Sequence, residues 1–123
     1  MTSKIDQIPD RKTREFARNC LEMKSVAELK IPHTAADANP DELDEWGLTP
    51  EAWSEAMDAA LHDLVDETES MFRQTLKIEE DIALGRWCAS CNTPWGIATR
   101  WGRDQEEAGN RLHNHVMGAD GPN

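Results

Sequence analysis

The chain contains no tyrosine and little cysteine, with three cysteines among 123 residues. It has no apolar run approaching the roughly 18 residues of a membrane-spanning helix, and its first residues lack the apolar stretch of a signal peptide. Three cysteines without an export signal argue against disulfide stapling and for a reducing compartment. We therefore expect a cytoplasmic protein that does not contact membranes.

Positive charge is scarce in the middle of the chain. The net charge is -11, and residues 31–84 carry 2 Lys or Arg against 15 Asp or Glu. Residues 1–30 carry 7 bases and 5 acids, and residues 85–123 carry 4 of each. Such an acidic segment repels nucleic acid and anionic membranes and attracts basic proteins. The simpler alternative is that the acidic surface only keeps a small protein soluble.

The first third of the chain has the start signals of two helices. Asp10 is a candidate N-cap for a helix that continues to about Lys24. Ser25 and Glu28 have the spacing of a capping box, which predicts a second, short helix directly afterwards. Helical structure is therefore expected over about residues 10–30.

A much longer helix is predicted next. Thr49 and Pro50 place a hydroxyl at the N-cap and a proline at the first helical position, and no glycine or proline follows until Gly85. A continuous helix over about residues 50–84 would be roughly 50 Å long. Its apolar stripe is longer than the first helix can cover, so we expect a homodimer through this helix, with a monomer whose helix breaks near Gln74–Glu80 as the alternative.

Two pairs of metal-ligating side chains follow in the C-terminal third. Cys88-x-x-Cys91 is separated by 21 residues from His113-x-His115. Two thiolates and two imidazoles are the ligands of a tetrahedral zinc site, and four protein ligands leave no open position for a reactive water. The pattern predicts structural Zn²⁺ bound by Cys88, Cys91, His113 and His115, without a catalytic residue.

Residues 86–117 resemble a Cys2His2 zinc finger in their order of knuckle, hairpin or loop, and helix carrying histidine. The helix is expected from Asp104 to about Met117. The segment departs from that family in its longer spacer and in its H-x-H spacing, because residues two apart on a helix are rotated by about 200°. Cys20, Asp104 or water is therefore an alternative fourth ligand in place of His113.

These features together predict a mainly α-helical protein in three parts. Residues 1–84 form a helical acidic body with one long amphipathic helix, residues 85–118 form a small zinc-binding module, and residues 119–123 form a flexible tail.

The cysteine pair also permits a redox interpretation. The segment from Trp87 to Cys91 resembles the redox motif of thioredoxins, in which a thiolate at a helix N-terminus attacks disulfides. That family places its motif in a βαβ unit, whereas here a long acidic helix is expected before the motif.

Hydrolase chemistry is a further alternative. His62-Asp63, with Asp66 and His33, resembles the His-Asp pair of metal-dependent phosphohydrolases, and Glu55-x-x-Asp58 resembles part of the carboxylate cluster of helical nucleotide pyrophosphatases. Both patterns lack the further ligands that a complete site needs, and a solvated helix face explains them equally well.

Nucleic-acid binding by the C-terminal segment is the main alternative function. Four arginines (Arg86, Arg100, Arg103 and Arg111) alternate there with Trp95 and Trp101, which suits phosphate contacts and base stacking. The net charge of the chain has the wrong sign for this role. We therefore expect a non-enzymatic interaction protein, an adaptor, regulator or inhibitor that uses its acidic helical surface and zinc module to bind a protein with a basic surface. One variant of this function is opposition to nucleic-acid-binding machinery by acidic mimicry.

Overall fold

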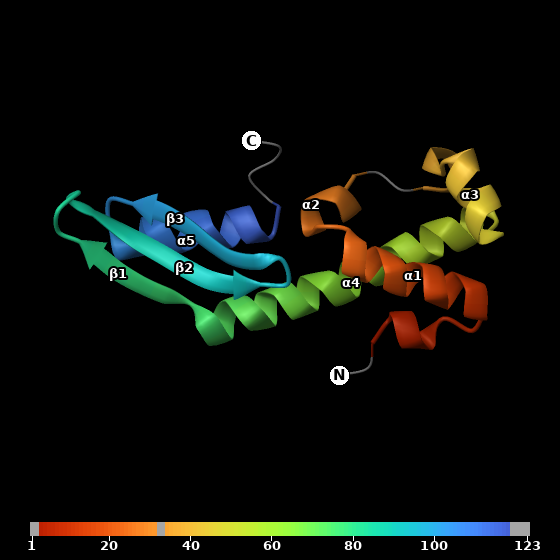
Figure 1. Cartoon of the computed structure of the whole chain (residues 1–123), viewed down its shortest axis with the longest axis horizontal. Helices are drawn as coiled ribbons and strands as arrows, with labels where there is room; N and C mark the ends of the chain where they lie inside the picture. The colour runs from red at the N-terminus through yellow and green to blue at the C-terminus, as the bar shows by residue number, and fades with distance from the viewer. Residues whose placement is uncertain (1–2, 32–33, 119–123) are drawn as a thin grey trace. The chain divides into compact units, whose positions relative to one another are not determined.

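The structure is a computed structural model that describes residues 3–31 and 34–118 (Figure 1). His33 and the predicted tail at 119–123 lie outside the described residues. The chain divides into two compact units, Met1–Val65 and Asp66–Asn123. None of the helices in the described ranges combines the length and the apolar character that crossing a membrane requires.

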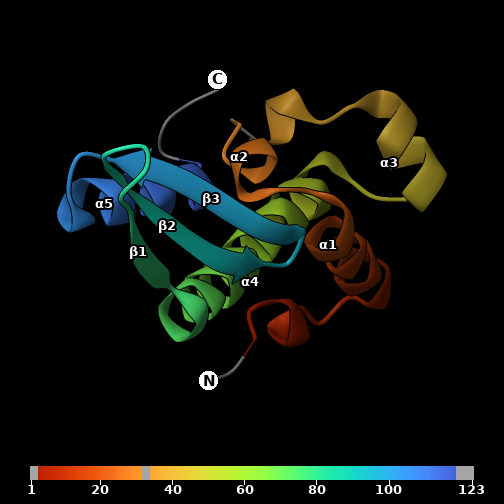
Figure 2. The same ribbon diagram turned by 60° about the vertical axis from the view of Figure 1, so that its left-hand side comes forward.

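The N-terminal unit is built from helices joined by short connections. They are the 3-10 turn η1 (Ile5–Gln7), α1 (Arg11–Met23), α2 (Val26–Leu29), the 3-10 turn η2 (Ala35–Asp37), α3 (Pro40–Trp46) and the first part of α4 (Pro50–Thr75). In both views α1 lies alongside the first half of α4 (Figures 1 and 2).

The predicted helix starts in this unit are confirmed by their capping bonds. The carboxylate of Asp10 accepts a hydrogen bond from the Thr13 amide at 3.0 Å, and Ser25 and Glu28 form both bonds of a capping box. The hydroxyl of Thr49 accepts from the Ala52 amide at 3.1 Å. Each bond satisfies an amide that the first turn of a helix leaves without a backbone partner.

Small side chains allow the helices of this unit to pack closely. Ala17 and Cys20 of α1 and Ala56 and Ala60 of α4 are fully buried in one core, together with Phe16. Phe16 also makes an edge contact with the indole of Trp46, with ring centroids 5.3 Å apart. That contact attaches α3 to α1 and fixes which face of α3 is turned outward.

The long helix is shorter than predicted. Helix α4 ends at Thr75, and Lys77–Asp81 form the strand β1. The Thr75 hydroxyl donates a hydrogen bond to the Met71 carbonyl at 2.6 Å and accepts one from the Asn92 amide at 2.7 Å. These two bonds join the end of the helix to the neighbouring sheet. The helix ends there even though the lysine and glutamates of β1 have high helix propensity.

The C-terminal unit is the main correction to the predicted fold class. Strands β1, β2 (Arg86–Thr93) and β3 (Gly96–Gly102) form an antiparallel sheet in the order β1-β2-β3, followed by α5 (Gln105–Val116) (Figure 1). The protein is therefore not a mainly helical chain with a zinc module, because a three-stranded sheet occupies residues 77–102.

Helix α5 packs on one face of this sheet and begins where predicted. Asp104 caps it by accepting a hydrogen bond from the Glu107 amide at 2.8 Å. Ala108 and Leu112 are fully buried. The start of α5 approaches β3 so closely that a Cβ on Gly102 would lie 2.4 Å from the backbone nitrogen of Ala108. Only glycine permits this approach.

Candidate functional site

The two cysteines of the predicted zinc site lie on strand β2. Residues three apart on a strand project from opposite faces of the sheet, so the thiols of Cys88 and Cys91 point away from each other. Cys91 is buried, and this burial raises the pKa of its thiol. Cys88 lies on the other face, where Trp101 is its partner on β3. The strand therefore provides neither the tight turn by which a zinc knuckle binds its metal nor the geometry that a disulfide between Cys88 and Cys91 requires.

The two histidines have other neighbours. The ring of His113 makes an edge contact with Phe72, with centroids 5.0 Å apart. The Nδ1 of His115 lies 2.7 Å from a guanidinium nitrogen of Arg100. Cys20, an alternative ligand, lies in the core of the N-terminal unit, where burial raises the pKa of its thiol to about 11.

Within the described part of the chain, no group of three or more His, Cys, Asp or Glu side chains is arranged to hold a metal ion. Zinc binding by Cys88, Cys91, His113 and His115 stays a prediction, and it would require β2 to exchange its strand geometry for a turn. Metal analysis of protein purified without added zinc, beside the Cys88→Ser variant, tests it directly.

The arginines of the C-terminal unit do not share one surface. The guanidinium of Arg86 lies 4.1 Å from the ring centroid of Trp101. Arg100 projects from the opposite face toward α5. Arg103 and Arg111 both pair with the carboxylate of Glu107 in α5, at 3.1 and 3.2 Å. The arginines that a nucleic-acid interface would combine are therefore divided between the two faces of the sheet or paired with Glu107.

The carboxylate of Asp63, part of the weak His-Asp pattern, has a structural partner set. It accepts hydrogen bonds from the Ser3 hydroxyl and from the Lys4 and Ile5 amides, the latter two at 2.9 and 3.0 Å. Burial alone would raise the pKa of this carboxyl, but these bonds, with a contribution from His62, lower it. Asp63 thus fastens the η1 segment to α4, a role that a pattern of neighbouring residues could not reveal.

Exposed negative charge is concentrated in α3 and the first turn of α4 of the N-terminal unit. No lysine or arginine occurs between Lys30 and Arg73 in the sequence. The exposed carboxylates of α3 and of the first turn of α4 lie within this stretch. We call these four residues the acidic ridge: Asp41, Asp44, Glu45 and Glu51.

Helix α3 presents the ridge because its opposite face is anchored. Trp46 packs on Phe16, and the Trp53 indole of α4 donates a hydrogen bond to the Glu42 carboxylate of α3 at 2.7 Å. Because Glu42 and Trp46 are held inward, positions 41, 44 and 45 share the outward face of the helix. They are three and four residues apart, which is the spacing of residues on one helix face. Sequence reasoning identified the acidic segment but not the Trp53–Glu42 bond, since that bond joins two elements.

The chain was compared with known protein families, curated proteins and solved structures, and none of them matches it.

Proposed function

We propose that this protein is a non-enzymatic interaction protein whose acidic ridge binds the basic surface of a partner protein. The observation that carries the proposal is the placement of exposed carboxylates at the C-terminal end of α3. Asp44 and Glu45 lie in the last turn of that helix, which has no basic residue. Negative charge there opposes the helix macrodipole, and each such residue destabilises the helix by about 0.3 kcal/mol or more.

A requirement for solubility alone does not favour Asp44 and Glu45, whereas Asp41 and Glu51 lie in the first turns of α3 and α4 and stabilise those helices. Exposed acidic residues at a helix N-terminus would supply the same net charge while stabilising the helix. A concentration of one sign of charge attracts and steers partners of the opposite sign, which suits a surface that binds basic proteins. The separation of Arg86 from Arg100, and the pairing of Arg103 and Arg111 with Glu107, favour this function over direct nucleic-acid binding.

The partner that fits the ridge is a protein with a cluster of lysine and arginine. Nucleic-acid-binding proteins are one class with such a surface, and occupation of that surface by the ridge would block their nucleic acid. This is the inhibitory form of the proposal. It predicts that nucleic acid and the acidic protein compete for the same partner.

The experiment compares capture by the intact protein with capture by two variants of equal charge. The ridge variant carries Asp41→Asn, Asp44→Asn, Glu45→Gln and Glu51→Gln. The control neutralises four exposed acids elsewhere, with Glu15→Gln, Glu22→Gln, Glu79→Gln and Glu106→Gln. We expect the intact protein to capture basic proteins that salt releases. The control variant should capture the same proteins, and the ridge variant should not. The proposal would be contradicted if salt did not release the captured proteins, or if the ridge variant captured them as well as the parent protein does.

A further inference from the structure

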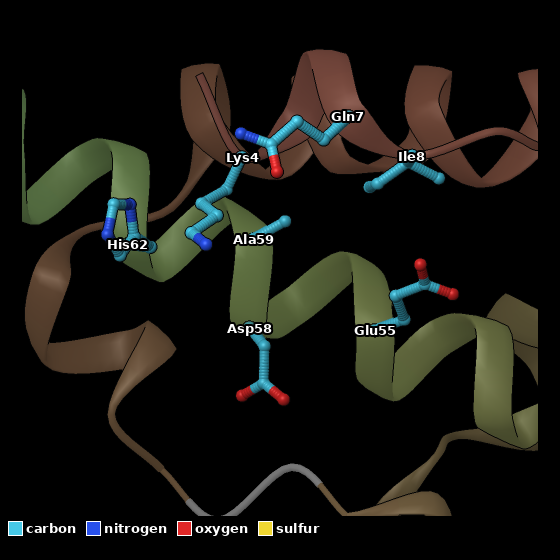
Figure 3. A pocket seen from close by; sticks show the side chains of 7 residues that line it. All are labelled: Lys4, Gln7, Ile8, Glu55, Asp58, Ala59 and His62. Carbon is cyan, nitrogen blue, oxygen red and sulfur yellow. The ribbon is translucent and has the colours of Figure 1, made fainter. Parts of the chain in front are cut away.

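The N-terminal unit contains a cavity that is open to solvent. It has a volume of about 420 Å³ and lies between the η1 segment and helix α4 (Figure 3). Lys4, Gln7 and Ile8 line it from one side, and Glu55, Ala59 and His62 from the other. This volume is at the lower end of the roughly 300–1,000 Å³ of ligand pockets, which suits one long side chain with part of its backbone.

The floor of the cavity is apolar and is part of the core. Ile8 is 4 % exposed and Ala59 is 8 % exposed, and both belong to the buried cluster of this unit. An aliphatic chain placed on Ile8 and Ala59 would therefore lose contact with water on one side without displacing a polar group.

The polar groups of the cavity are arranged at its two ends. In Figure 3 the Glu55 side chain extends from α4 toward Ile8, whereas Lys4 lies nearer to His62. Asp58 also borders the cavity, but its carboxylate points away from the η1 segment in this view. The end formed by Glu55 thus favours a cation, and the end formed by Lys4 and Gln7 favours a carbonyl or another acceptor.

We propose that this cavity binds an arginine side chain of the basic partner. The aliphatic stem lies on Ile8 and Ala59, and the guanidinium pairs with Glu55. Lys4 and Gln7 donate to backbone carbonyls of the same partner segment. Arginine fits better than lysine because its charge is delocalised over a planar, weakly hydrated group, which lowers its repulsion from Lys4. The inference rests on the proposed function and adds a specific anchoring side chain to it.

The probe is N-acetyl-L-arginine methylamide, titrated into the intact ¹⁵N-labelled protein and followed by the amide resonances. We expect saturable shifts concentrated at Gln7, Ile8 and Ala59. The control probe is N-acetyl-L-citrulline methylamide, which has nearly the same shape but no charge, and it should produce no saturable shift. Equal shifts with the two probes, or shifts spread evenly over the acidic residues, would overturn the proposal.

Three single variants are expected to have effects of different size. Glu55→Gln should raise the apparent dissociation constant for the arginine probe about threefold or more, because it removes the pairing charge. Lys4→Met should change that constant by less than about twofold, because it removes a like charge and a donor to the carbonyls of the probe together. Glu51→Gln, one helical turn earlier and outside the cavity, should raise it clearly less than Glu55→Gln does, because the attraction between charges weakens with distance. An unchanged constant in Glu55→Gln refutes the assignment.

The same variants separate this inference from the proposed function. If a captured basic partner is lost from the ridge variant but binds Glu55→Gln as well as it binds the parent, the cavity assignment fails and the ridge stands. If the arginine probe binds as expected but the ridge variant captures the same partners as the parent protein, the ridge fails and the cavity is an independent arginine site.

Discussion

Replacement of Gly102 by alanine is the sharpest test of how the C-terminal unit is packed. Gly102 ends strand β3 and faces the first turn of α5. A Cβ at this position would lie 2.4 Å from the backbone nitrogen of Ala108 and 2.9 Å from the carbonyl carbon of Glu107. Both are backbone atoms, so no side-chain rotation can relieve the overlap.

The size of the effect follows from the missing distance. Unbonded carbon and nitrogen atoms pack at about 3.5 Å, so the start of α5 would have to move outward by about 1 Å. Such a shift loosens the contact of Ala108 and Leu112 with the sheet. Overpacking of this kind costs about 2–3 kcal/mol, and we expect Gly102→Ala to lower the free energy of unfolding by that amount.

The matched control is a glycine in the same unit with the opposite expectation. A Cβ on Gly109, in the interior of α5, would lie 3.4 Å from the Cδ1 of Ile78, which is ordinary contact with the end of a flexible side chain. Because alanine favours the helix over glycine by about 1 kcal/mol, Gly109→Ala should be neutral or stabilising by up to that amount.

Urea unfolding of the two variants is best followed by the intensities of amide resonances between residues 77 and 116, which report on this unit alone. Gly102→Ala should shift the midpoint to lower urea, and Gly109→Ala should not. If Gly102→Ala unfolds within about 0.5 kcal/mol of the parent, the close approach of α5 to β3 is wrong.

Three further predictions concern single side chains. Hydrogen bonds lower the pKa of Asp63 in the folded state, so its stabilising contribution is present above the unfolded pKa near 4 and is lost as the pH falls through the folded pKa. The Asp63→Asn variant should therefore lose stability less steeply with falling pH in this range. An acid unfolding curve identical to that of the parent would contradict the assignment. Thr68 is fully buried and its hydroxyl has no hydrogen-bond partner among the described residues, so Thr68→Val should stabilise the protein by about 1 kcal/mol in thermal unfolding, whereas a destabilised variant would indicate a partner for the hydroxyl. Cys88 should react first with a thiol reagent at neutral pH, ahead of Cys91 and Cys20, whose thiol pKa values are raised by burial; a faster reaction of Cys20 would mean that the N-terminal core opens.

The helix starts could be predicted because capping is local. Asp10, Ser25, Thr49 and Asp104 each bond an amide three residues ahead, and that spacing is visible in the sequence. The favoured prediction carried α4 on to residue 84, whereas the helix ends at Thr75, where the alternative of a break near Gln74–Glu80 placed it. Lys77 to Asp81 are mostly good helix formers, and they form a strand only because residues 86–90 pair with them.

The predicted zinc site shows a second reason for such errors. The spacing of Cys88 and Cys91 suits a tight turn, in which both thiols face one metal, and it equally suits a strand, in which they face opposite sides. The residues between them do not decide the question. The pairing of Cys88 with Trp101 and of Cys91 with Ala98 does, and those contacts involve residues further along the chain.

The bonds from residues 3–5 to Asp63 have a consequence for the motions of the protein. They join positions about 60 residues apart, and Ile5 is buried beside them. A contact of this range forms late in folding, and it can open locally while the helices stay folded. Such opening would expose Ile5 and Ile8 together, and it would become more frequent as acid protonates Asp63. Exchange of the Lys4 and Ile5 amide hydrogens with solvent should therefore report a breathing motion of the N-terminal segment, separate from global unfolding.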